Sequence, residues 1–196
     1  MNQRVVLASA SPRRRELLSS IGIAFDVVPS HIPEVRNLGE APEEYVARLS
    51  REKAHAIAAQ HPHRWVIAAD TTVLLGDQLL EKPEDAADAE RMLAAIAGKT
   101  HIVYTGVTLE KHSSDYRETR VAESEVRMLP LSKEDIAWYV RTGEPLDKAG
   151  AYAVQGIGAM FIDGIHGSYT NVVGLPLATL FQMLRRAGLD PLRPNA

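Results

Sequence analysis

Apolar residues along this chain follow two alternating spacings, and this alternation is the strongest constraint on its fold. Short continuous apolar runs, typical of buried strands, are separated by longer stretches in which apolar residues recur at helical intervals. The alternation predicts an α/β domain and argues against a helical bundle or a β-sandwich. No repeat or linker divides the 196 residues, so we expect one domain, with residues 189–196 as a loose tail.

Turn and capping residues set the expected boundaries of these elements. Ser11 is a predicted N-cap followed by Pro12 at the first helical position, and Ser132 with Asp135 resembles a capping box. No element is assigned to the glycine-dotted region 150–174. Strands are expected at 5–8, 25–28, 65–70, 73–80 with a hairpin turn at Gly76-Asp77, 103–110 and 119–128, and helices at 12–21, 42–60, 86–97, 133–140 and 176–186.

Composition and charge narrow the classes of function. The net charge is −3 and the isoelectric point is about 6.2, so no broad basic surface for DNA is expected. The absence of cysteine excludes disulfides, thiolate metal sites and a cysteine nucleophile. No secretory signal or membrane-spanning run is recognised, so we expect a cytoplasmic protein without a membrane partner.

Three arginines open the first expected helix, directly after Ser9 and Ser11. Arg14 projects onto the apolar face of that helix, and a helix N-terminus disfavours positive charge. A bound anion would remove both problems, because guanidinium groups, hydroxyls and free backbone N–H groups would converge on it. We therefore predict a phosphate-binding turn; the alternative is that Arg14 pairs with a structural carboxylate while Arg13 and Arg15 are solvated.

Two further charged residues break apolar patterns. Lys53 lies within the apolar stripe of the helix at 42–60, which predicts a buried partner, although its stem could also run over apolar surface to the solvent. Asp70 ends the strand at 65–70, where ligands collect in open α/β sheets, so we predict a role in chemistry or metal binding; capping of a turn is the alternative. Glu34 and Lys82 carry little signal by themselves.

Several other signals point to no site. The histidines are scattered without zinc-type spacing, and His55 and Arg48 are interpreted as ordinary charges on the solvent face of a helix. The pair Gly156 and Gly158 lacks the third glycine of a dinucleotide fingerprint. The sequence has neither a GKS or GKT phosphate loop nor a serine-hydrolase elbow.

Six short sequence blocks occur in a fixed order and at characteristic separations, and together they are specific for one protein family. With them the chain resembles the Maf family of nucleoside triphosphate pyrophosphatases over nearly its whole length. The resemblance implies an elongated, twisted mixed sheet flanked by helices, two lobes with a central cleft, and a relationship to inosine triphosphate pyrophosphatases. The blocks are LASASPRR at 7–14, REKA at 51–54, ADT at 69–71, EKP at 81–83, PLDKAGAYAVQGIG at 145–158 and VGLP at 173–176.

Within the family, the sequence is similar to the subgroup that acts on dTTP and UTP. The resemblance implies that Asp70 accepts a proton and that Arg13, Thr71 and Gln155 determine base specificity; for Gln155, bracing of the adjacent glycine turn is the alternative. We expect Glu34 and Asp70 to hold Mg²⁺ or Mn²⁺, and a metal-bound water to attack the α-phosphorus and release pyrophosphate. The expected catalytic residues are Asp70, Glu34, Lys53 and Lys82, and the expected substrate-binding residues are Ser9, Ser11, Arg13, Arg14, Thr71 and Gln155.

Other functions stay open at the level of sequence. The substrate could be CTP, pseudouridine triphosphate or 7-methyl-GTP, although the subgroup acting on 7-methyl-GTP tends to carry tryptophan where this chain has Arg13. From another class, the chain could be a nucleotide-binding or DNA-binding regulator of cell division without turnover. The acidic balance argues against DNA. The sequence does not decide the oligomeric state and leaves a homodimer open.

Overall fold

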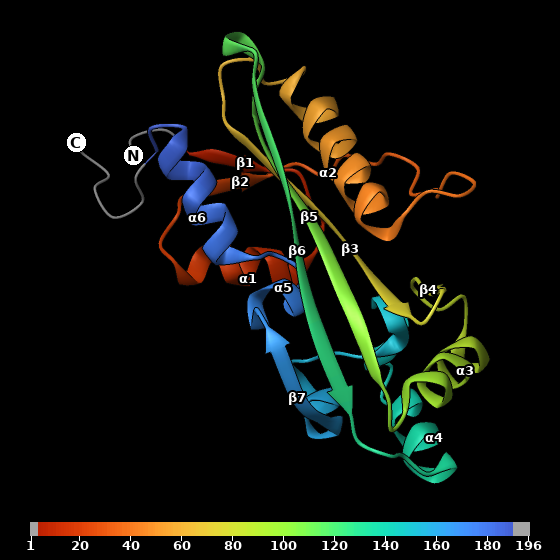
Figure 1. Cartoon of the computed structure of the whole chain (residues 1–196). Coiled ribbons are helices and arrows are strands. Elements are labelled where there is room, and N and C mark those ends of the chain that lie inside the picture. Colours follow the sequence, from red (N-terminus) through yellow and green to blue (C-terminus); the bar gives the residue numbers. More distant parts are fainter. Residues whose placement is uncertain (1–3, 190–196) are drawn as a thin grey trace. The chain divides into compact units, whose positions relative to one another are not determined.

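The computed structural model describes residues 4–189 and gives them a mixed α/β fold, which confirms the predicted class (Figure 1). The strands are β1 (Val5–Leu7), β2 (Phe25–Val27), β3 (Val66–Leu75), β4 (Gln78–Leu80), β5 (Thr100–Lys111), β6 (Tyr116–Met128) and β7 (Ile162–Gly167). The α-helices are α1 (Pro12–Ser20), α2 (Pro42–Ala58), α3 (Ala86–Ile96), α4 (Lys133–Arg141), α5 (Tyr169–Val173) and α6 (Leu177–Arg186). Short 3₁₀ helices are η1 (His112–Ser114), η2 (Glu144–Asp147), η3 (Ala149–Ala151) and η4 (Gly156–Phe161).

The described strands form a mixed sheet in the order β2-β1-β3-β5-β6-β7, with β4 paired to β3. Strand β1 is parallel to both β2 and β3, whereas the pairs β3–β4 and β6–β7 are antiparallel. The predicted hairpin turn at Gly76-Asp77 is present, and Gly76 adopts a φ of 57°, a left-handed conformation that glycine accepts without strain. Within residues 4–189, no helix is long and apolar enough to cross a bilayer.

The prediction that a strand ends at Asp70 is wrong. Strand β3 continues through Asp70 to Leu75, because the following Thr71, Thr72 and Val73 are β-branched and the strand goes on to pair with β4. The strand that ends nearby is β1, whose last residue, Leu7, is in register with Ile67 of β3. Asp70 therefore lies just beyond the carboxyl end of β1, at the edge where ligands of open α/β sheets are expected.

The glycine-dotted region contains structure that the sequence pattern did not predict. Strand β7 and helices α5 and η4 lie within it, and η3 overlaps its start. Glycines with positive φ, such as Gly150 and Gly156, interrupt each short element before a hydrophobic period can develop. Of the predicted loose tail, only Leu189 is among the described residues; its backbone N–H donates to the carbonyl of Leu184.

The described residues divide into two compact units. Unit 1 comprises residues 4–70, 105–122 and 174–189, and unit 2 comprises residues 71–104 and 123–173. The expected organisation as one family domain with a cleft between two lobes stays a prediction.

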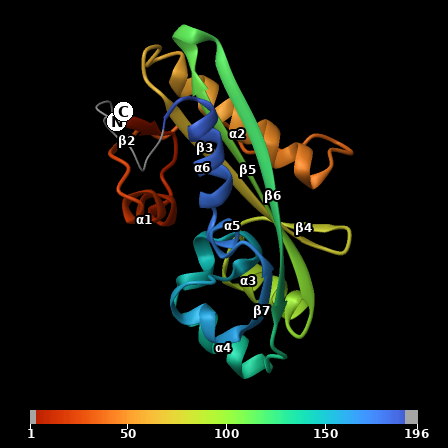
Figure 2. The same cartoon turned by 60° about the vertical axis from the view of Figure 1, so that its left-hand side comes forward.

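In unit 1, α2 lies on one side of the strands, and α1 and α6 lie on the other (Figures 1 and 2). Helix α2 approaches β5 closely, because Gly106 has no side chain and a Cβ at this position would overlap the backbone of Val46. Ser50 of α2 shares a buried hydrogen bond of 2.9 Å with Thr108 of β5, which in turn bonds Thr119 of β6 at 2.8 Å. These contacts hold the inward face of α2 against the sheet.

In unit 2, α3 packs against α4 and η3 around an apolar core that includes Leu93, Ile96 and Tyr139. His101 is buried in the same unit, and its Nε2 lies 2.8 Å from the hydroxyl of Tyr152. Burial lowers the pKa of His101 to about 4, so this histidine is neutral near pH 7 and belongs to the core.

The close approach of α2 can be tested at Gly106. Replacing it with alanine should lower the free energy of unfolding by at least about 2 kcal/mol, because the added methyl group meets backbone that cannot rotate away. Urea denaturation measures the effect. Gly164→Ala is the matched control in a strand, since its nearest neighbour is a side-chain atom 3.9 Å away. Equal stability of the two variants would show that α2 is free to shift outward.

Candidate functional site

Lys53 is the centre of a charged cluster in unit 1. The residue is only 6% exposed, and its Nζ lies 2.6 Å from Oε1 of Glu34 and 2.5 Å from Oδ1 of Asp70. The amine is therefore paired in the interior and does not extend along the apolar surface to solvent, so that alternative is wrong. Two predicted carboxylates meet at one predicted cation, although the three residues are far apart in the sequence.

The three partners come from different elements. Lys53 lies two turns after Val46 on the face of α2 that packs on the sheet, and Asp70, also 6% exposed, comes from β3. Glu34 comes from the segment that joins β2 to α2, and its side chain is 42% exposed. Asp70 and Lys53 thus form the buried side of the cluster, and Glu34 forms its accessible side.

Arg48 holds the segment that carries Glu34. Its guanidinium donates to both carboxylate oxygens of Glu40, at 2.6 and 2.8 Å, and to the carbonyl of Val35 at 2.8 Å. The hydrogen bonds from Arg48 lower the pKa of Glu40 to about 2. The interpretation of Arg48 as an ordinary solvent-face charge is therefore wrong: it ties the Glu34 segment to α2. Sequence pattern gave no signal for this, because the partner carbonyl belongs to an irregular segment.

The arginine turn lies between β1 and α1, as predicted. Ser11 is the N-cap of α1 and Pro12 its first residue, although no side-chain capping bond forms. The guanidinium of Arg14 donates to Oγ of Ser9 at 3.2 Å and to the carbonyl of Gly174 at 2.8 Å. Burial lowers the pKa of Arg14, while the negative charges of Asp70 and Glu34 oppose that shift. The turn and the Lys53 cluster are thus electrostatically coupled.

The predicted site residues fall into two sets. Unit 1 contains Ser9, Ser11, Arg13, Arg14, Glu34, Lys53 and Asp70, and the contacts above connect most of them. The positive charge of Arg13 further lowers the pKa of Arg14, so the two arginines are electrostatic neighbours. Unit 2 contains Thr71, Lys82 and Gln155. Lys82 is exposed, whereas Thr71 and Gln155 are partly buried.

Gln155 precedes a turn that another residue braces. The carboxylate of Glu144 accepts from the backbone N–H groups of Ile157 at 2.9 Å and Gly158 at 3.1 Å, and from the hydroxyl of Tyr139 at 3.1 Å. The Oε1 atom of Gln155 is buried and has no hydrogen-bond partner among the described residues. Glu144 therefore does the bracing that the alternative assigned to Gln155. Sequence reasoning missed it because the recognised block begins one residue later, at Pro145.

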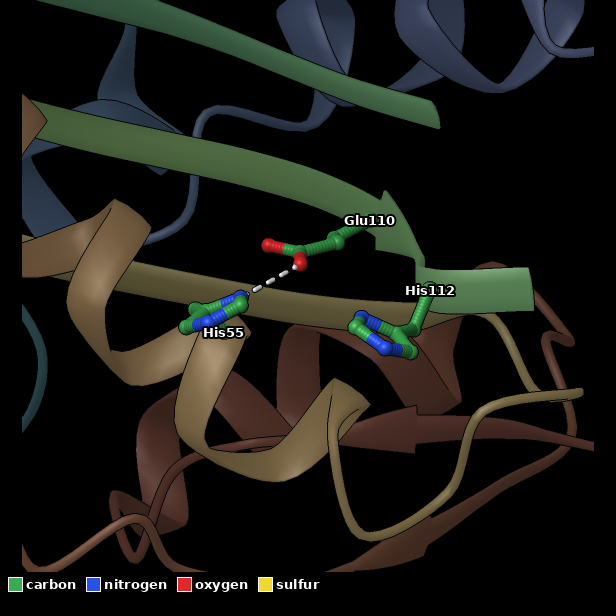
Figure 3. A group of neighbouring side chains, drawn as sticks. All are labelled: His55, Glu110 and His112. Atoms are coloured by element: carbon green, nitrogen blue, oxygen red, sulfur yellow. Dashed lines mark hydrogen bonds and ion pairs between the residues drawn. The ribbon is translucent and has the colours of Figure 1, made fainter. Parts of the chain in front are cut away.

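Two places in unit 1 offer ligands for a metal. Glu34 and Asp70 supply the hard oxygen donors that Mg²⁺ prefers, and both contact the same nitrogen of Lys53, so the two carboxylates lie close enough to share an ion. Elsewhere, the fold brings His55 and His112 together with Glu110 (Figure 3). The sequence shows no zinc-type spacing for these two histidines, and it is the packing of α2 on β5 that brings them together.

Fold and site together define an α/β protein with a cationic turn beside a buried lysine and two carboxylates. A family profile described as Maf-like protein matches residues 4–187. The chain belongs to this family, as its sequence blocks predicted.

The relatives of the chain are similar to it over nearly their whole length. A dTTP/UTP pyrophosphatase of Myxococcus xanthus is 54% identical over 94% of this chain and 93% of its own. Proteins with the same name from Koribacter versatilis and Syntrophus aciditrophicus are 49% and 47% identical, and cover 94% and 96% of this chain and 95% and 92% of their own. A solved Ham1 protein of Staphylococcus aureus shares 14% identity, with a TM-score of 0.45 over 82% of this chain and 80% of that one, and is too distant to bear on function.

The buried pair of Lys53 and Asp70 predicts a non-additive loss of stability. Lys53→Met should lower the free energy of unfolding by about 3 kcal/mol, because it leaves a buried carboxylate without its cation. The double variant Lys53→Met/Asp70→Asn should recover most of that loss, since the unpaired charge is then gone. Chemical denaturation measures both, with the exposed helix residue Lys133→Met as control. Additive effects in the cycle would contradict the pairing.

Proposed function

We propose that this protein is a nucleoside triphosphate pyrophosphatase that hydrolyses dTTP and UTP to the nucleoside monophosphate and pyrophosphate. The observation that carries the proposal is the cluster in which Lys53 joins Glu34 and Asp70 beside Arg14. The names of the relatives, which are about half identical to this chain, support the same reaction and the same substrates.

The residue types suit a triphosphate. Phosphoryl and nucleotidyl transfer depends mainly on positioning and on neutralising the charge of the phosphates. Arg13 and Arg14 lie in the first turn of α1, where the positive end of the helix dipole favours phosphate, and Ser9 orients the Arg14 guanidinium. Lys53 and Lys82 supply the remaining positive charge. We assign the phosphates of the substrate to these groups.

Glu34 and Asp70 would hold a divalent cation, Mg²⁺ or Mn²⁺, which when bound supplies Lewis-acid charge neutralisation at the phosphates. Asp70 accepts the proton of the attacking water. Its position is fixed because Lys53 holds one carboxylate oxygen and both residues are buried. The oxygen of that water forms a bond to the α-phosphorus, and the bond between this phosphorus and the bridging oxygen breaks, so pyrophosphate leaves with the electron pair.

Gln155, with Thr71 and Arg13, is assigned to the base. Uracil and thymine present an N3–H donor between two carbonyl acceptors, and a glutamine amide offers one acceptor and one donor. The buried Oε1 of Gln155 has no partner among the described residues, so it is available to accept from N3–H. The brace from Glu144 fixes the turn that directly follows Gln155. A mismatched polar group in such a place costs about 1–3 kcal/mol, enough for base selection.

The compartment and the partners of the enzyme are assigned from the chemistry of its proposed substrates. Nucleoside triphosphates are soluble metabolites, and the chain has no cysteine and a net charge of −3. We place the enzyme in the cytoplasm, with nucleotides as partners and neither DNA nor membrane, and leave a homodimer open.

Isotope labelling tests the reaction. In H₂¹⁸O with Mg²⁺, UTP and dTTP should yield labelled monophosphate and unlabelled pyrophosphate, as measured by mass spectrometry. Asp70→Asn should reduce turnover by at least about 10²-fold, the usual contribution of a general base. Label in pyrophosphate, release of single phosphates, or tight nucleotide binding without turnover would contradict the proposal; the last result would favour a non-catalytic regulator. Preference for CTP, pseudouridine triphosphate or 7-methyl-GTP in the same assay would contradict the assigned substrate.

Base recognition is tested at Gln155. Gln155→Glu should lower kcat/KM for UTP and dTTP more than for CTP, because a carboxylate still accepts from N3–H but repels the neighbouring carbonyl oxygens of uracil and thymine. The exposed Gln78→Glu, in the same unit, adds the same charge and should leave the ratios unchanged. Unchanged ratios in Gln155→Glu would transfer the role to Thr71 and Arg13.

A further inference from the structure

A cluster of metal-ligating side chains lies in unit 1, and the proposed reaction does not use it. His55 comes from α2, Glu110 from the end of β5, and His112 is the first residue of η1. Figure 3 shows His55 and Glu110 facing each other, with His112 beside them. Nδ1 of His55 lies 3.0 Å from Oε1 of Glu110, and one ligand atom from each of the three residues lies within 4.8 Å of the others.

Arg117 of β6 already places a positive charge at this cluster. Its Nε lies 2.8 Å from Oε2 of Glu110, and its Nη2 lies 2.9 Å from Oε1 of Glu110 and 2.9 Å from Nδ1 of His55. The cluster thus attracts a cation at the point where the carboxylate and the imidazole nitrogen converge. The side chain of Arg117 is 43% exposed, so it can turn toward solvent when another cation enters.

The contacts around Nδ1 of His55 cannot all be satisfied by hydrogen bonds. If Nδ1 is deprotonated, it accepts from Arg117 but faces the acceptor Oε1 of Glu110 at 3.0 Å. If Nδ1 carries a proton, it donates to Glu110 but faces a guanidinium that can only donate. A metal ion bound to both lone pairs removes this conflict, because it needs no proton on either atom.

We propose that His55, Glu110 and His112 bind a divalent transition metal of the Zn²⁺ type, which displaces the guanidinium nitrogen of Arg117 from His55 and from Oε1 of Glu110. Zinc bonds of about 2.0–2.2 Å at tetrahedral angles place neighbouring ligand atoms roughly 3.3 Å apart. The observed separation of 3.0 Å between His55 and Glu110 is close to this value. His112 is exposed, so rotation of its ring can bring it to the same distance, and water completes the site.

The carboxylate is prepared for this role. Glu110 is only 2% exposed, and Arg117 donates to both of its carboxylate oxygens, which holds Oε1 facing Nδ1 of His55. The ligand atom is thus already in position near the end of β5.

The ligand set separates this site from the one at Glu34 and Asp70. Two imidazole nitrogens and one carboxylate favour Zn²⁺ and its transition-metal neighbours, whereas two carboxylates with phosphates favour Mg²⁺ or Mn²⁺. The inference is independent of the proposed reaction. A bound ion would connect α2 to the β5–β6 turn and so stabilise the folded protein.

The test is titration of the metal-free protein with Zn²⁺ by calorimetry in excess Mg²⁺, with the melting temperature recorded in parallel. We expect one zinc ion per chain and a rise in melting temperature. His55→Ala, His112→Ala and Glu110→Gln should each weaken binding at least about tenfold, since loss of even an outer partner of a metal ligand costs that much. His61→Ala and His63→Ala, which remove other histidines near the end of α2, should bind as the unaltered protein does.

Arg117→Gln tests the displacement separately. Removal of the competing guanidinium should tighten zinc binding several-fold. Unchanged zinc affinity in both His55→Ala and His112→Ala, or no zinc binding by the unaltered protein, would overturn the site. Weaker binding in Arg117→Gln would overturn the exchange of one cation for the other. Hydrolysis of nucleotides does not enter any of these measurements.

Discussion

The candidate site in unit 1 depends on one interaction: the amine of Lys53 lies between the carboxylates of Asp70 and Glu34. Taking charges out of water is costly, and an ion pair of this kind seldom adds net stability compared with apolar residues of the same size. The ion pair is therefore better explained by a role in the reaction than by a contribution to the stability of the fold. The pair fixes a carboxylate and a cation in one geometry, which is what the proposed reaction requires of Asp70 and Lys53.

The distance between Lys53 and Asp70 is set by how closely the backbone of α2 packs on the sheet. Helix α2 can lie close to β5 only because Gly106 lacks a side chain. The close approach buries the hydroxyl groups of Ser50 and Thr108, and these satisfy each other by sharing a hydrogen bond. Lys53 lies on the same face of the helix as Val46. An outward shift of α2 would lengthen the distance from Lys53 to Asp70, so packing and chemistry in this unit cannot vary independently.

The features of the fold that depend on short stretches of sequence could be predicted. The alternation of spacings predicted the mixed α/β class. The Gly76-Asp77 pair predicted the turn before β4, and Ser11 with Pro12 predicted the start of α1, because each of these features is decided by a few neighbouring residues. A lysine in an apolar stripe correctly predicted a buried partner. The end of a strand at Asp70 was misplaced, since the β-branched residues after it favour continuation and the carboxyl end that matters belongs to β1.

Contacts between residues that are distant in the sequence could not be predicted. Arg48 and the carbonyl of Val35, and His55 with Glu110, each meet across a distance in sequence that no spacing rule covers. Glu144 was missed for the same reason: the backbone N–H groups that donate to it lie 13 and 14 residues along the chain, and such contacts leave no periodic signature.

The brace at Glu144 has a consequence for how this chain can change over generations. A Cβ at Gly156 would lie 2.9 Å from Oε2 of Glu144, and Gly156 has a φ of 70°. Position 156 is therefore closed to other residues for two reasons: the carboxylate at 144, and a left-handed backbone that strains any side chain even where space is available. A shorter residue at 144 would remove only the first of these obstacles. Drift in this turn can begin at Glu144, with loss of the brace, but not at the glycine.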